Sequence, residues 1–168
     1  MWRSRFAFTR SCCPSGASRC VTECSRASWR CLSFKKALSQ SNLDYSKESL
    51  SRVDVLLDQI RLRLRPKYNE FLGNQANVNF LYLLAFYIGK VVAIETSSKI
   101  EWYGYEEMIA LIPSNRDFFP NCFGTSVTCV LSGGKKPGGF FVPLAAVESR
   151  LYEEAPDKSV AFSAGAFM

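Results

Sequence analysis

The longest apolar stretch of the chain runs from Asn77 to Thr96 and has Lys90 in its middle. A helix that is apolar on nearly every side lies either in a protein core or across a membrane. The 17 residues from Val78 to Ile94 reach only the lower end of the roughly 17–25 that a membrane span needs. The less apolar positions recur every three or four residues and mark one side that can face water: Asn79, Tyr82, Phe86 and Lys90. We therefore expect a buried central helix, with a membrane span as the alternative.

An amphipathic helix is predicted before this segment, from Lys47 to about Leu64, with Ser46 as its N-terminal cap. The apolar positions that form its buried stripe are spaced by three or four residues: Leu50, Val53, Leu57, Ile60 and Leu64. The opposite side carries charged residues, which we interpret as solvent-exposed: Asp54, Asp58, Arg61 and Arg65. Pro66 ends the helix because proline cannot continue it.

Two glycines carry information about packing and turns. Gly89 lies inside the central helix, where glycine costs about 1 kcal/mol relative to alanine. That cost predicts the close approach of a neighbouring element at Gly89. Gly73 and Asn74 mark a turn within a connection that runs from Lys67 to Gln75.

After the central helix the apolar segments become shorter. Alternation predicts a strand at Ile100–Tyr103. The apolar positions of Tyr105–Ile112 fit the period of a helix and that of a strand. We favour a helix, because Glu106 and Glu107 suit its first turn. The remaining predicted elements are strands at Phe123–Leu131 and Phe140–Val142, a helix from Pro143 to Ala155, and a final strand at Ser159–Ser163.

These elements predict an α+β fold, in which a small, mostly antiparallel sheet packs against the central apolar helix and two amphipathic helices. We expect one domain, residues 43–168, because all periodicity begins after residue 42 and the chain has 168 residues. Residues 1–40 carry a net charge of +7, which leaves −1 for the other 128 residues. The basic character therefore belongs to the leader, and we expect no specific nucleic-acid binding by the folded domain.

The leader, residues 1–42, is rich in Arg, Ser and Cys and has no apolar run typical of a secretory signal. We favour a disordered extension or a segment upstream of the true start, and expect the domain to fold without it. An organelle-targeting presequence and a basic arm for anionic surfaces are the alternatives. Five of the seven cysteines lie here, at spacings that lack the paired C-x2-C of a zinc site: Cys12, Cys13, Cys20, Cys24 and Cys31.

The chain contains no histidine. This excludes the Cys/His zinc patterns, the Ser-His-Asp and Cys-His nucleophile systems, and the commonest general base. Cys122 and Cys129 lie in or beside an apolar strand without a basic partner, which predicts buried, inert thiols. We therefore assign no catalytic residue, no metal site and no cofactor.

Two segments are candidates for binding. The acidic and aromatic run from Glu101 to Glu107 combines large contact area with carboxylates that suit a basic partner, and its candidate partner-binding residues are Trp102, Tyr103, Tyr105, Glu106 and Glu107. The alternative is that its aromatic side chains pack inward. The glycine-rich loop around Lys135 and Lys136 could hold an anion, but it lacks the Walker spacing, so a solvated hairpin loop is favoured.

The order of elements resembles a widespread family of small bacterial α+β domains of unknown function. The likeness covers about residues 43–163 and rests on Ser46–Leu57, Tyr87–Val92, Trp102 and Phe141–Leu151. In this family an acidic residue is expected after the glycine at position 89, where this chain has Lys90. The resemblance implies a protein that works by binding, similar to immunity or accessory proteins. Separately, we expect a cytoplasmic location.

The sequence thus favours a non-enzymatic domain that binds a protein partner and has no membrane span. The alternative is an enzyme that depends on a thiol or a carboxylate. The sequence indicates no particular small-molecule ligand.

Overall fold

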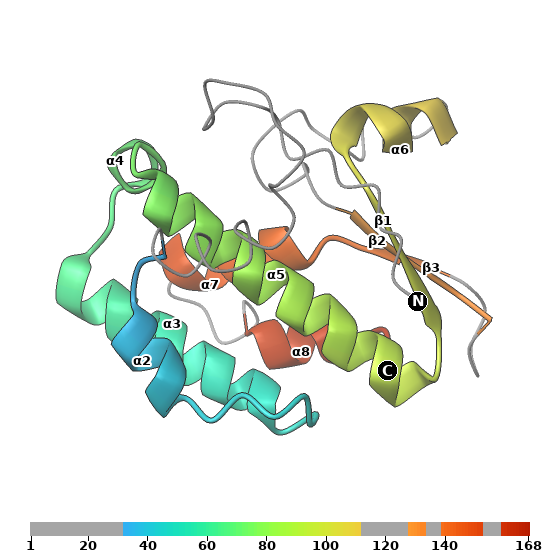
Figure 1. Ribbon diagram of the computed structural model, residues 1–168, viewed down its shortest axis with the longest axis horizontal. Coiled ribbons are helices and arrows are strands. Elements are labelled where there is room, and N and C mark those ends of the chain that lie inside the picture. The colour runs from blue at the N-terminus through green and yellow to red at the C-terminus, as the bar shows by residue number, and fades with distance from the viewer. Residues whose placement is uncertain (1–31, 112–127, 134–138, 153–158) are drawn as a thin grey trace, which may run out of the picture. The chain divides into compact units, whose positions relative to one another are not determined.

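The computed structural model describes residues 32–111, 128–133, 139–152 and 159–168. Figure 1 shows α5 running through the folded unit, with α4 at its start, α7 beside it and a small sheet beside its C-terminal part. The three described strands are antiparallel in the order β1-β2-β3, so the predicted α+β fold is confirmed. The described elements are α2 (Lys35–Gln40), α3 (Ser49–Leu64), α4 (Tyr68–Leu72), α5 (Gln75–Thr96), β1 (Lys99–Tyr103), α6 (Tyr105–Leu111), β2 (Thr128–Ser132), β3 (Gly139–Phe141), α7 (Pro143–Tyr152) and α8 (Val160–Gly165).

Helix α5 is the predicted central apolar helix. It begins at a cap in which the Asn74 side chain accepts a hydrogen bond from the Ala76 N–H at 2.9 Å. Leu81, Leu84 and Ile88 are fully buried. Helix α5 packs against α4, α7 and β1. Its length and composition would also suffice for a membrane span, and 56% of its most apolar window is buried. The absence of a span stays a prediction.

Gly89 permits the contact between α5 and β1. A Cβ atom at this position would lie 2.4 Å from Cη2 and 2.8 Å from Cζ2 of Trp102. These separations are far below van der Waals contact, so only glycine lets the indole ring approach the helix in this way. The Trp102 ring also meets Phe86 edge-on, with centroids 4.8 Å apart. The predicted close approach at Gly89 is confirmed.

Helix α3 is the predicted amphipathic helix. The Ser46 hydroxyl accepts the Ser49 N–H at 3.2 Å, so the serine expected as a cap serves the first turn. Leu50, Val53, Leu57 and Ile60 are buried as predicted. Leu64 is instead 56% exposed, because the helix ends there and Arg65 turns left-handed with φ 44°. The last turn of α3 therefore runs past the core.

The sheet has one face towards the core. Trp102 of β1 is paired across the strands with Cys129 of β2, which is paired with Phe141 of β3. Cys129 and Phe141 are buried, and Trp102 packs against the core. The predicted strands at Ile100–Tyr103 and Phe140–Val142 correspond to β1 and β3, and the favoured helix at Tyr105–Ile112 corresponds to α6. Strand β2 covers the described part of the segment Phe123–Leu131, of which residues 123–127 lie outside the description.

The described fold begins earlier than residue 43, where the sequence predicts its start. Leu32 and Leu38 are buried in the core, and the Phe34 ring packs against Phe71 and Phe80. The Ser33 N–H donates to the Ala76 carbonyl at 3.1 Å and ties this segment to the start of α5. Helix α2 has only six residues, too few to show an apolar period in the sequence. Residues 1–31 lie outside the description.

Two further expectations are wrong. The connection Lys67–Gln75 contains the short helix α4, which buries Phe71. The final strand predicted at Ser159–Ser163 is instead the start of helix α8. Ser159 caps this helix by accepting the Phe162 N–H at 3.2 Å, and the alternation of apolar residues did not reveal that cap. Of the helix predicted from Pro143 to Ala155, the structure describes the part up to Tyr152.

Candidate functional site

The acidic and aromatic run folds as strand β1 followed by helix α6. On β1, the Glu101 carboxylate accepts from Lys99 Nζ at 2.6 Å and from the Tyr103 hydroxyl at 2.9 Å. The hydrogen bond from Lys99 and then that from Tyr103 lower the pKa of Glu101, while the hydrogen bond to Glu101 raises the pKa of Lys99. The three side chains alternate with Ile100 and Trp102, so they lie on the sheet face opposite the one that packs on the core. This face is closed at its Tyr103 end, where the cross-strand partner Thr128 is fully buried.

Two more carboxylates follow on α6. Glu106 and Glu107 are exposed in its first turn. One oxygen of Glu107 accepts the Gly104 N–H at 2.8 Å, which satisfies a backbone donor just before the helix. Within the described part of the chain, neither glutamate forms an ion pair. We call Glu101, Tyr103, Glu106 and Glu107 the acidic edge.

The other two residues predicted to bind a partner, Trp102 and Tyr105, are not part of the acidic edge. Trp102 is half-buried and points towards α5, where its indole ring packs against Gly89 and Phe86. Its inward direction follows from strand alternation, because its neighbours Glu101 and Tyr103 face outward. The inward-packing interpretation therefore holds for Trp102. The side chain of Tyr105 lies outside the description.

The outer sheet face adds two residues that the sequence analysis did not select. Glu101 is paired across the strands with Val130, which is paired with Phe140, so the three side chains share one face. Phe140 is 39% exposed and Val130 is half-buried. Val130 and Phe140 are identified by the pairing register between the strands, and the sequence of a single strand does not contain that register. An acidic strand edge thus continues into an apolar row across the sheet.

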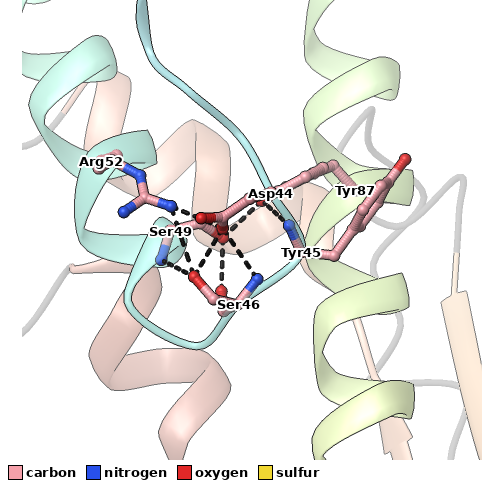
Figure 2. Close-up of polar contacts among 6 residues, drawn as sticks. All are labelled: Asp44, Tyr45, Ser46, Ser49, Arg52 and Tyr87. Carbon is pink, nitrogen blue, oxygen red and sulfur yellow. Dashed lines mark hydrogen bonds and ion pairs between the residues drawn. The ribbon is translucent and has the colours of Figure 1, made fainter.

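A second polar cluster fastens the loop before α3, as Figure 2 shows. The Asp44 carboxylate accepts from the Ser46 hydroxyl and from Arg52 Nη2, both at 2.6 Å. Hydrogen bonds from the Ser46 side chain and backbone, followed by the smaller effect of Arg52, lower the pKa of Asp44 to about 2. A carboxylate held so strongly in its ionised form is a poor base, so the Asp44–Ser46 pair is not arranged for nucleophilic catalysis.

The same loop is tied to α5 through a buried tyrosine. Tyr87 donates from its hydroxyl to Ser49 Oγ at 2.5 Å and accepts the Tyr45 N–H at 2.9 Å (Figure 2). The Tyr45 and Tyr87 rings stack with centroids 4.9 Å apart. Tyr45 itself is left-handed, with φ 62°, an unfavourable conformation for a residue with a side chain. These contacts hold the loop in that conformation, which indicates a structural role.

The charged side of α3 is not the solvent-exposed surface that the sequence predicts. Asp54 is 7% exposed and accepts from the N–H groups of Val160 and Ala161, at 2.7 and 3.2 Å, and from the Ser159 hydroxyl at 2.7 Å. Its carboxylate therefore caps the first turn of α8. One Arg150 nitrogen lies 3.7 Å away.

Asp58 continues this arrangement one turn further along α3. It pairs with Arg150 of α7 at 2.5 Å and with Arg61 of its own helix at 3.0 Å. Both carboxylates of α3 thus serve to attach α7 and α8. The sequence analysis missed this role because their partners lie about a hundred residues further along the chain.

A third cluster lies between α4 and α7. Burial raises the pKa of the Glu148 carboxyl to about 7, and a hydrogen bond from Tyr68 opposes that shift. Glu148 Oε1 and the Tyr152 hydroxyl are both enclosed and have no hydrogen-bond partner. A general acid or base must be able to reach its substrate, and this oxygen is closed off from solvent. The cluster is therefore interpreted as a contact between helices.

The remaining sequence candidates give no reactive site. Cys129 is buried, and burial raises the pKa of its thiol to about 12, so it is not a nucleophile at neutral pH. Cys122, Lys135 and Lys136 lie outside the described residues. In the described segments, no group of three or more Cys, Asp or Glu side chains is placed to hold a metal ion.

Comparison of the chain with protein-family models, with curated proteins and with solved structures finds no match. The class of this protein is therefore given by its own structure, an α+β domain built around an apolar helix.

Proposed function

We propose that this protein is a non-enzymatic domain that binds a basic protein partner through the acidic edge. The observation that carries the proposal is the exposure of Glu106 and Glu107 in the first turn of α6, directly after β1, without a paired cation in the described segments. Elsewhere in those segments, Asp44, Asp58 and Glu70 are paired with arginine or lysine, and the exposed carboxylates without an ion pair there, Glu48 and Glu95, stand singly rather than as neighbours. Unpaired, exposed carboxylates can receive lysine or arginine side chains without first breaking an internal ion pair.

The apolar row next to this edge supports a protein as the partner. Exposed Phe140 and half-buried Val130 lie on the same face as Glu101. A surface that combines a large apolar side chain with charged groups at its margin has the composition of a protein interface. The resemblance to immunity-like domains adds the same expectation by analogy.

The test compares capture of partners by three forms of the full chain. The wild type, the Glu106→Lys, Glu107→Lys variant and a Glu95→Lys control are used as bait in native lysate, and captured proteins are quantified at low and high salt. Glu95 is a suitable control because it is exposed on α5, outside the acidic edge.

We expect at least one basic protein that binds the wild type and the control, is lost from the double variant, and dissociates at high salt. Equal capture of every partner by the double variant and the control would contradict the proposal. A crosslink from the partner to the region of β1 and α6 would locate the contact directly.

A further inference from the structure

Helix α4 is attached to α7 by aromatic contacts. It has only five residues, too few for a helix to persist alone in water. Its two aromatic side chains supply the contact: the Tyr68 and Tyr152 rings meet edge-on with centroids 5.2 Å apart, and the Phe71 and Tyr152 rings do so at 6.2 Å. Helix α4 also packs against α5, and Phe71 stacks on Phe34, so the aromatic contact with α7 is one of several that hold α4 in place.

An ionisable group lies within the same contact. Glu148 is on α7, one turn before Tyr152, and is hydrogen-bonded to Tyr68 of α4. Its Oε1 atom and the Tyr152 hydroxyl are enclosed without a hydrogen-bond partner. When the carboxyl is ionised, a negative charge is held where solvent does not reach one of its oxygens, which is unfavourable unless a cation compensates.

The neighbouring elements supply no such cation among the described residues. On α4, Lys67 and Glu70 pair with each other at 3.2 Å and remain exposed. On α7, Arg150 is engaged by Asp54 and Asp58 of α3, and Arg61 of α3 also pairs with Asp58.

The other two helices that pack on α7 do not change this balance. Helix α5 has no charged side chain from Gln75 to Gly89, and its Lys90 and Glu95 are exposed in the later turns. Its ionisable side chains before Lys90 are the phenols of Tyr82 and Tyr87. Helix α8 has no ionisable side chain.

We propose that Glu148 is a pH-sensitive contact between α4 and α7: the enclosed Oε1 atom tolerates the neutral carboxyl, whereas its ionisation, in spite of the hydrogen bond from Tyr68, favours opening of α4 so that solvent reaches the charge. Burial raises the pKa of this group to about 7, from an ordinary value of 4.5. Because the folded form binds the proton more tightly than the unfolded chain, the contribution to stability is complete below the ordinary value. It is lost as the pH rises through about 7. The loosening thus develops between pH 4.5 and about 7 and is complete above that range.

Hydrogen exchange of the full chain tests the proposal. The Phe71 and Gly73 amides are reporters, because they donate within α4 at 2.9 and 3.0 Å. After correction for intrinsic exchange, their protection should fall by up to about tenfold for each pH unit between 4.5 and about 7 and level off above that range, and the amides of α3 should not follow. The Glu148→Gln variant keeps the shape but cannot ionise, so its protection should not depend on pH. Glu70→Gln, an exposed change on α4, should respond as the wild type does.

The proposal is overturned if Glu148→Gln shows the same pH response as the wild type, or if all helices lose protection together. A second variant covers the case in which Glu148→Gln does not fold. Tyr68→Phe removes the hydrogen bond that favours the ionised carboxylate, so the midpoint of the transition should move to higher pH. An unchanged midpoint in that variant would also overturn the proposal.

Discussion

Carboxylates are used in opposite ways in two regions of this protein. On the side formed by α3, α7 and α8, Asp54 is nearly buried and receives three hydrogen bonds from the start of α8. On the acidic edge, Glu106 is exposed in the first turn of α6. The two side chains have similar chemistry, so the difference lies in what surrounds them. A buried carboxylate with paired donors joins elements, whereas an exposed one remains available to a partner.

The largest effect on stability is expected when the buried carboxylate, Asp54, is removed. Asp54→Ala leaves two N–H groups and a hydroxyl without their acceptor and removes the carboxylate that lies 3.7 Å from Arg150 Nε. We expect the free energy of unfolding to fall by about 3 kcal/mol, measured by urea denaturation. Glu106→Ala on the acidic edge is the matched control and should change it by less than about 0.5 kcal/mol. Similar values for both variants would contradict the distinction between the two regions.

A smaller effect is expected where the acidic edge is attached to the core. Gly89→Ala would normally stabilise a helix by about 1 kcal/mol, but here the new Cβ atom meets the Trp102 ring at 2.4 Å. We expect a net loss of about 2 kcal/mol in the free energy of unfolding. Introducing the same change into a Trp102→Phe background should cost less, because the smaller ring lacks the clashing atoms. Stabilisation by Gly89→Ala in the wild-type background would show that β1 does not pack here.

The smallest effect on stability is expected in the loop before α3. Tyr87→Phe removes the hydroxyl that accepts the Tyr45 N–H and donates to Ser49. Thermal or urea unfolding should show a loss of about 1 kcal/mol. Tyr45→Phe keeps the ring and the backbone N–H and removes only a hydroxyl from a side chain that is 49% exposed, so it should be nearly neutral. A neutral Tyr87→Phe would mean that the loop is held by other contacts.

Local patterns predicted much of the fold. The spacing of Leu50, Val53, Leu57 and Ile60 is enough to predict the buried face of α3, because a helix brings such positions to one side. Uniform apolarity likewise predicts the central helix, and Gly89 in its interior predicts a close neighbour. Each of these signals lies within one segment, so no knowledge of the rest of the chain is needed to interpret it.

The candidate surface was predicted only in part. Glu106 and Glu107 are exposed as helix-start carboxylates should be, whereas Trp102 turns inward because strand alternation places it opposite Glu101. The neighbouring Val130 and Phe140 join the surface through cross-strand pairing. That pairing depends on the register between segments, which the sequence of one strand does not contain.

The sequence alone determined the apolar faces of the main helices, because periodicity and burial are properties of single elements. Only the tertiary structure decided the roles of the charged groups. Asp54 and Asp58 occupy what the helix period marks as an exposed side, and Asp54 becomes buried and Asp58 half-buried because α7 and α8 pack against α3. The same packing turns the predicted strand at Ser159–Ser163 into α8, since the Asp54 carboxylate satisfies the backbone donors at its start. Hydrophobic burial is predictable from spacing along a segment, whereas a hydrogen-bonded charge requires a partner whose position the fold alone provides.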